Sequence, residues 1–86
     1  MKLREIIKKV SNPERKRLEI NYRTHTPYDR DVLVGICHYD YPTGELISDD
    51  GDSYYLDDEM DGYDIFTDEF SGDQFLMVWY ESEWVE

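Results

Sequence analysis

The chain has 86 residues, 40% of them hydrophobic and 15% aromatic, which suits one small folded domain spanning residues 1–86. Nine Lys and Arg residues against 21 Asp and Glu residues give a formal charge of −12, which argues against direct DNA binding and attraction to anionic membranes. The sequence contains neither an apolar run of about 20 residues, as a membrane span needs, nor the apolar core of a signal peptide. A single cysteine excludes an internal disulfide and points to a reducing compartment.

The two signs of charge are segregated along the chain. All nine basic residues lie between Lys2 and Arg30, whereas residues 31–86 contain seventeen acids and no Lys or Arg. A field of one sign destabilises a compact fold through self-repulsion. We therefore expect the acids to have a function, with solubility or a halophilic source as the alternative.

The first residues predict an amphipathic helix. Apolar side chains recur at the i, i+3, i+4, i+7 spacing of one helical stripe, at Leu3, Ile6, Ile7 and Val10. Ser11-Asn12-Pro13 is expected to end this helix, because the residue before a proline disfavours α geometry.

Two strands and a hairpin are predicted next. Residues 18–22 alternate apolar and polar side chains, which indicates a strand with one buried face. Residues 32–39 are apolar on both faces, as is typical of a central strand. The sequence Tyr41-Pro42-Thr43-Gly44 predicts a turn that leads into a return strand at residues 45–47.

The remaining chain predicts further turns and two more strands. In the irregular stretch 48–62, Asp50-Gly51 and Asp61-Gly62 are both turn signals. Residues 63–66 indicate a strand. Ser71-Gly72-Asp73 predicts a turn into residues 74–80, the most apolar run, which we expect to form a second central strand.

Together these elements predict an α+β fold of two layers, with the N-terminal helix packed on a four- to five-stranded antiparallel sheet. The face of the sheet without the helix would expose apolar side chains. Either residues 48–62 or a second copy of the chain would then cover that face.

One acidic stretch partly matches a calcium-binding loop. Positions 1, 3, 5, 6 and 12 of an EF-hand loop correspond to Asp57, Glu59, Asp61, Gly62 and Asp68. However, Asp64 stands where the motif has an aliphatic residue, and position 12 is not the longer glutamate. We expect no tight calcium site, with loose cation binding as the alternative.

The sequence offers no convincing catalytic site. Cys37 and His38 are neighbours on a predicted strand and point to opposite faces, so they cannot share a metal ion or form a thiol–imidazole pair. Pairs of carboxylates are unavoidable among 21 acids, and an 86-residue chain can hardly build a catalytic cleft beside its core. We predict a non-enzymatic protein with no catalytic residues, no metal ligands and no cofactor.

Acids with interleaved tyrosines make up the predicted partner-binding surface. Its residues are Asp49, Asp50, Asp52, Tyr54, Tyr55, Asp57, Asp58, Glu59, Asp61, Tyr63, Asp64, Asp68, Glu69 and Asp73. Carboxylates at alternate strand positions recur about every 6.6 Å, and DNA carries one phosphate per ~3.4 Å of each strand. Such carboxylates can therefore occupy Lys and Arg side chains that normally hold DNA, with tyrosines as anchors. The alternative is a solvated acidic loop whose tyrosines pack against the sheet.

A small, strongly acidic α+β chain with this surface resembles the DNA-mimic inhibitors of phages and mobile elements. Type II anti-CRISPR proteins are the most similar in size, charge and expected layout, and the opening Met1-Lys2-Leu3-Arg4-Glu5-Ile6-Ile7-Lys8 is similar to that of many short phage proteins. Uracil-DNA glycosylase inhibitors are similar in size and charge, but their Glu-Ser-Ile strand is matched here only by Glu81-Ser82-Glu83. These families share no motif, so the resemblance assigns no individual residue.

The resemblance implies an inhibitor that occupies the nucleic-acid-binding site of a bacterial defence enzyme in the host cytoplasm. The expected partner is a CRISPR RNA-guided nuclease with its guide RNA, at the place where arginines recognise the short motif beside the target. The alternatives are an acidic adaptor that could form a homodimer, an immunity protein for a basic toxin, or an inhibitor of another DNA enzyme such as uracil-DNA glycosylase.

Overall fold

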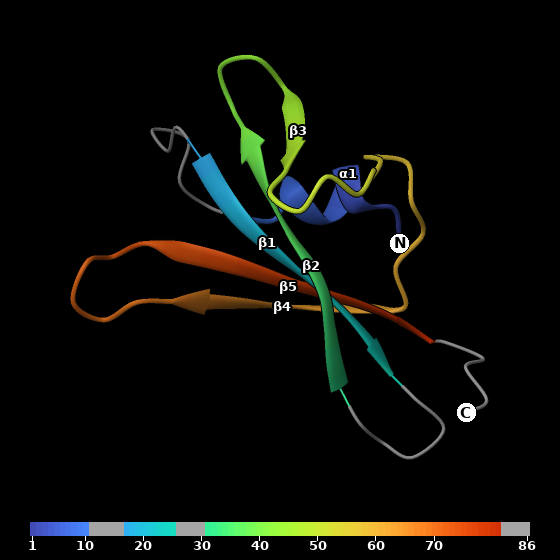
Figure 1. Ribbon diagram of the computed structural model, residues 1–86. Helices are drawn as coiled ribbons and strands as arrows, with labels where there is room; N and C mark the ends of the chain where they lie inside the picture. The colour runs from blue at the N-terminus through green and yellow to red at the C-terminus, as the bar shows by residue number, and fades with distance from the viewer. Residues whose placement is uncertain (11–16, 26–30, 82–86) are drawn as a thin grey trace.

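The computed structural model describes residues 1–10, 17–25 and 31–81 (Figure 1). A short helix, α1 (Leu3–Ile7), is followed by five strands: β1 (Arg17–His25), β2 (Asp31–Asp40), β3 (Glu45–Ser48), β4 (Gly62–Thr67) and β5 (Gln74–Glu81). The fold is therefore mostly β. The predicted end of the helix at Ser11-Asn12-Pro13 lies outside the described residues.

The five strands form one sheet in the order β3-β2-β1-β5-β4, with β1 at its centre. Three neighbouring pairs are antiparallel, but β1 and β5 run parallel, so the predicted antiparallel sheet is wrong and the sheet is mixed. The reason is the path of residues 49–61, which carry the chain from β3 at one edge to β4 at the other. The β4–β5 hairpin then returns the chain beside β1, in the same direction as β1.

Helix α1 is shorter than the apolar stripe that predicted it. It ends at Ile7, and the amides of Lys9 and Val10 then donate to carbonyls three residues earlier, in a tighter turn. The stripe is nevertheless buried as predicted, because Leu3 and Ile6 are 0% exposed and Val10 only 8%. A helix of five residues has little stability of its own, so burial of these side chains must hold it in place.

One face of the sheet carries the hydrophobic core. Its fully buried side chains alternate along the three inner strands, at Leu18, Ile20, Tyr22, Cys37, Leu76 and Val78. Helix α1 and residues 49–61 cover this face, and Met60 from the latter joins the core. Each fully buried aliphatic side chain contributes about 1.5–3 kcal/mol, so this layer is the main source of stability.

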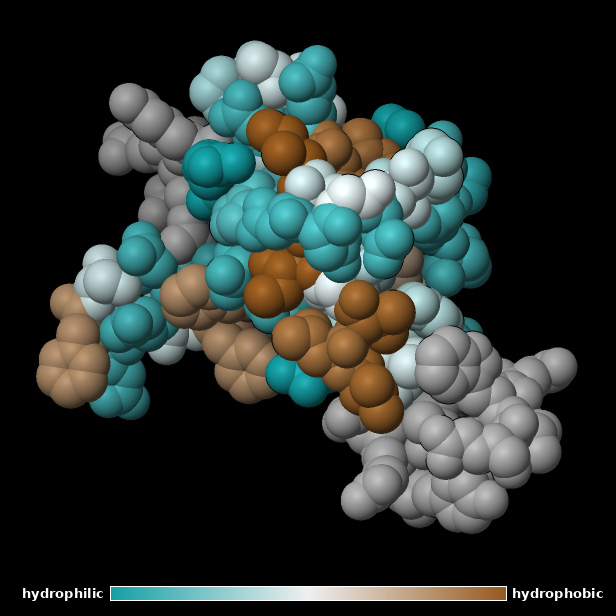
Figure 2. Space-filling model, viewed as in Figure 1, coloured by the Kyte–Doolittle hydropathy of each residue, from teal (hydrophilic) through white to brown (hydrophobic). Residues whose placement is uncertain are grey.

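The opposite face of the sheet has no covering layer among the described residues. Its centre is polar, because Glu19, Asn21 and Arg23 alternate with the buried residues of β1. Apolar side chains flank them, and Leu33, Ile47 and Phe66 are 46%, 41% and 51% exposed. Figure 2 shows apolar surface in patches between hydrophilic residues. The predicted exposed apolar face is confirmed, but residues 49–61, apart from Asp49 at their start, lie on the other face and do not cover it.

Glycines mark three of the four predicted turns. Gly44, Gly51 and Gly72 have positive φ angles of 70°, 85° and 75°, which few other residues adopt. The turn predicted at Asp61-Gly62 is wrong in this respect, since Gly62 begins β4 with no positive φ. A Cβ atom at residue 62 would overlap the ring of Trp79, its partner on β5. Glycine is needed there for close packing.

Candidate functional site

The predicted partner-binding residues lie in two regions of the structure. Nine of them belong to residues 49–61, here called the acidic segment, which connects β3 to β4. The other five belong to the β4–β5 hairpin: Tyr63 and Asp64 in β4, and Asp68, Glu69 and Asp73 at its tip. Figure 1 shows the hairpin tip and the acidic segment on opposite sides of the molecule. They therefore do not form one continuous surface.

Aspartates also shape the acidic segment by accepting hydrogen bonds from their own loop. Asp50 accepts a 2.6 Å bond from the Ser48 hydroxyl and a 3.0 Å bond from the Asp52 amide. Both bonds lower the pKa of Asp50, and the bond from Ser48 has the larger effect. The carboxylate of Asp58 accepts the Tyr55 amide at 3.2 Å. The ionised carboxylate of Asp50 is thus part of the loop geometry.

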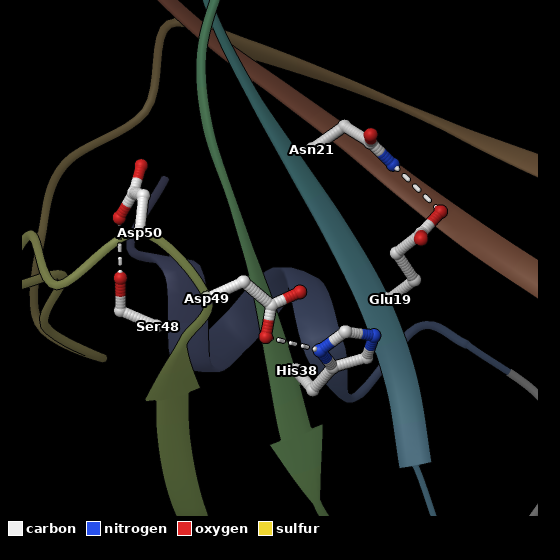
Figure 3. A network of polar contacts seen from close by, with 6 residues as sticks. All are labelled: Glu19, Asn21, His38, Ser48, Asp49 and Asp50. Atoms are coloured by element: carbon white, nitrogen blue, oxygen red, sulfur yellow. Dashed lines mark hydrogen bonds and ion pairs between the residues drawn. The ribbon is translucent and has the colours of Figure 1, made fainter.

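The start of the acidic segment is tied to the open face of the sheet. Asp49 Oδ1 lies 3.1 Å from Nδ1 of His38 (Figure 3). His38 projects from β2 on the side opposite Cys37, its neighbour along the strand. On the neighbouring strand, Asn21 donates to Glu19 at 3.3 Å. Cys37 itself is buried in the core, so the prediction that Cys37 and His38 occupy opposite faces is confirmed.

The N-terminal residues neutralise part of the acidic segment. Arg4 Nε donates a 2.7 Å hydrogen bond to Asp57 Oδ1, and the Met1 amine lies 3.2 Å from a Glu59 carboxylate oxygen. Arg4, and Lys2 less strongly, lower the pKa of Asp57. Backbone bonds reinforce the contact, since the amides of Leu3 and Arg4 donate to carbonyls of the acidic segment. The basic beginning of the chain therefore holds this segment in place.

The three predicted tyrosine anchors differ in exposure. Tyr54 stacks on Tyr22 and extends across β2, where its hydroxyl lies over Gly35. Burial raises the pKa of Tyr54 to about 12, and the charges of Asp50 and Asp52 add to the effect. Tyr63 packs against the core. Only Tyr55, which is 64% exposed, projects freely from the surface.

An open pocket of about 340 Å³ lies between the acidic segment and the sheet. Its lining includes three tyrosines, Tyr22 from β1, Tyr54 from the acidic segment and Tyr80 from β5. Asp58 and Glu59 add carboxylates to the same lining. This concave, aromatic and acidic site was missed from the sequence, because it depends on β5 lying beside β1.

Phe70 is a second feature that the sequence did not single out. It sits at the hairpin tip and is 100% exposed. The turn below it is held by Asp68, whose Oδ1 accepts the amides of Phe70 and Ser71 at 2.8 and 3.3 Å. The signal in the sequence was an aromatic residue inside a tight turn, where it has nothing to pack against.

The described residues contain no group of three metal-ligating side chains that could hold an ion. The partial EF-hand match does not form a loop, because Gly62–Thr67 runs as strand β4. Within the same part of the chain, the only helix is far too short to cross a lipid bilayer. Comparison with protein-family models, curated proteins and solved structures finds no match to this chain.

Proposed function

We propose that this protein is a non-enzymatic inhibitor that mimics DNA with its acidic segment and occupies the nucleic-acid-binding site of a bacterial defence enzyme in the cytoplasm. The expected target is a CRISPR RNA-guided nuclease, so the protein would act as an anti-CRISPR. The observation that carries the proposal is the acidic segment itself. It holds seven carboxylates within thirteen residues, and hydrogen bonds from Ser48 and from amides of the segment fix two of them, Asp50 and Asp58.

The arrangement of charges supports binding to a basic surface. Carboxylates with lowered pKa values, such as Asp50 and Asp57, stay ionised at neutral pH. A partner that holds DNA presents Lys and Arg side chains, for which such carboxylates are charge-assisted acceptors. Tyr55, which is exposed beside these acids, would supply an apolar contact, which favours a protein partner over free ions.

A second candidate is an acidic adaptor or immunity protein that binds a basic host or toxin protein. The separation of the hairpin tip from the acidic segment favours it, because two acidic regions on opposite sides do not follow a single DNA path. The two candidates differ in one testable respect. A DNA mimic must be displaced by the DNA of its target, whereas an adaptor need not be.

The proposal is tested by capture of bacterial nucleoproteins on the immobilised protein, elution with a salt gradient and mass spectrometry. We expect one DNA-handling enzyme to be retained and to be released by its own DNA. Retention of one basic protein that DNA does not release supports the adaptor instead. Weak retention of many basic proteins, all lost at modest salt, overturns both candidates and leaves solubility as the explanation of the charge.

Matched variants locate the binding surface. Asp52→Asn with Asp57→Asn and Asp64→Asn with Glu69→Gln each remove two exposed charges, the first pair from the acidic segment and the second from the hairpin. We expect the first variant to slow association with the captured enzyme about tenfold at low salt, and the second about twofold or less. Equal effects of the two variants contradict a role specific to the acidic segment.

A further inference from the structure

The proposed function gives no role to the pocket lined by Tyr22, Tyr54 and Tyr80. Its volume of about 340 Å³ lies within the usual range of sites for small groups, about 300–1,000 Å³. Three aromatic rings line it together with Asp58 and Glu59, and no Lys or Arg of the described residues contributes to the lining. An anion is therefore repelled from the pocket. A purely apolar group would remove water from the carboxylates without replacing their hydrogen bonds.

Tyr22 contributes a buried aromatic ring to the lining of the pocket. Its side chain is 0% exposed, and its hydroxyl makes no hydrogen bond of ordinary geometry within the part of the chain that the structure describes, although the Cys37 thiol lies near. Burial raises the pKa of Tyr22, and the charge of Asp58 acts on the same hydroxyl.

The two carboxylates of the pocket differ in how far they are already neutralised. Glu59 is paired with the Met1 amine at 3.2 Å. Asp58 accepts the Tyr55 amide through Oδ2 at 3.2 Å, and no ion pair to Asp58 is formed by the residues that the structure places. Within the described part of the chain, the pocket therefore keeps one carboxylate without a cationic partner, beside aromatic rings.

From these observations we propose that the pocket binds the guanidinium group of an arginine side chain on the partner protein. A guanidinium is flat, stacks on aromatic faces and donates several hydrogen bonds in one plane. It can rest against the tyrosine rings while donating to the Asp58 carboxylate. A lysine ammonium carries the same charge but has no flat face, so it fits these walls less well. This inference rests on the proposed function, because it names the group on the basic partner that the acidic segment would receive.

The test titrates the intact protein with a small probe, Nα-acetyl-arginine methylamide, and follows backbone amide signals by NMR. The matched probe is the citrulline analogue, which keeps the shape but has no charge, and the lysine analogue keeps the charge without the flat group. We expect arginine to shift signals of residues 53–60, Tyr22 and Tyr80 with saturation, lysine to bind about fivefold more weakly, and citrulline not to bind. Equal binding of arginine and citrulline, or shifts confined to other regions, overturns the proposal.

Variants then separate the pocket from general charge. Asp58→Asn keeps an oxygen for the Tyr55 amide and removes the charge, whereas Asp57→Asn removes a charge outside the pocket. We expect Asp58→Asn to weaken arginine binding at least about fivefold and Asp57→Asn less than twofold. Tyr80→Leu, with Tyr55→Leu as its control, tests the aromatic wall by a second route, and thermal unfolding checks that each variant folds. Equal losses of arginine binding in Asp58→Asn and Asp57→Asn overturn the proposal that arginine binds in the pocket.

The two proposals fail in different ways. If arginine binds in the pocket but no DNA-handling enzyme is captured, the proposed function is wrong and the pocket stands. If an enzyme is captured and released by DNA, but Asp58→Asn and Tyr80→Leu leave its affinity and arginine binding unchanged, the pocket assignment is wrong and the function stands.

Discussion

The ring of Tyr54 stacks on the ring of Tyr22, with centroids 4.0 Å apart and planes inclined by 19°. Tyr22 belongs to the central strand and is fully buried, whereas Tyr54 belongs to the acidic segment. This aromatic pair, together with Met60 in the core, links the acidic segment to the centre of the sheet. A contact that stabilises the core therefore also helps to position the acids.

Removal of this ring should be costly. We expect Tyr54→Ala to lower the free energy of unfolding by about 2–4 kcal/mol, because a large partly buried ring and its stacking partner are lost together. Tyr55→Ala removes a neighbouring ring that is 64% exposed and should cost about 0.5 kcal/mol or less. Urea unfolding of the two variants measures the difference, and similar costs for both contradict the role given to the stack.

Packing against Trp79 makes a separate prediction at Gly62. Because a Cβ at residue 62 overlaps the Trp79 ring, Gly62→Ala should destabilise the fold by about 2–3 kcal/mol. In a Trp79→Leu background the same substitution should cost clearly less, since the obstructing ring is gone. Gly51→Ala serves as the control. It meets nothing within 4 Å, and its φ of 85° limits the expected cost to about 1–2 kcal/mol. An unchanged cost in the Trp79→Leu background contradicts the packing argument.

The strands were largely predictable from local patterns, whereas their pairing was not. Alternation at residues 18–22 identified the one-sided burial of β1, and the glycines at 44 and 72 identified two hairpin turns. Residues 74–80 are apolar on both faces, and that pattern is the same for an inner strand of either direction. The parallel pairing of β5 with β1 is decided by the route of the acidic segment across the sheet, which no local pattern records.

The pH dependence of stability should report on Cys37. Burial raises the pKa of this thiol to about 12, so the folded protein keeps a proton that the unfolded chain loses above about pH 8.5. The unfolded state then binds fewer protons than the folded state, and stability falls as the pH rises from about 8.5 towards 12, by up to about 1.4 kcal/mol per pH unit. Below about pH 8.5 this contribution is fully present.

The matched variant for this prediction is Cys37→Ala. Its stability should stay level until about pH 9, where Tyr22 and Tyr54, whose pKa values burial also raises, begin to lose protons in the unfolded chain. Urea unfolding of both proteins between about pH 7 and about pH 10.5 gives the two profiles. Parallel profiles between about pH 8.5 and about pH 10 rule out Cys37 as the group responsible.

Two carboxylates of the acidic segment should respond to different neighbours. Arg4→Gln should raise the pKa of Asp57 and leave that of Asp50 unchanged, because Arg4 is the main cause of the first lowered value. Ser48→Ala should do the reverse, since the Ser48 hydroxyl is the main cause of the second. Carboxyl-carbon NMR signals followed through the acid range measure both groups in one titration. If either variant changed the pKa of both carboxylates, long-range charge, and not these contacts, would set their pKa values.

The composition of the binding surface was predictable, but its shape was not. The sequence identified the acids and tyrosines of residues 49–73, because charge and residue type are local properties. It did not separate the hairpin tip from the acidic segment, since both follow one another along the chain and diverge only through β4. Nor did the sequence distinguish the exposed Tyr55 from Tyr54, because the ring of Tyr54 stacks on Tyr22, which is more than thirty residues away in sequence.

The parallel pairing of β1 with β5 has a consequence for the order of events during synthesis on the ribosome. The β1–β2 and β2–β3 hairpins can form as soon as they emerge, but the second edge of the central strand stays unpaired until Gln74–Glu81 has been made. Contacts of such long sequence separation slow folding, because the intervening chain must first be ordered. A nascent chain halted within β4 would therefore leave one edge of β1 without a hydrogen-bonded neighbour. The acidic segment would then have only the sheet formed by β1, β2 and β3 to pack against.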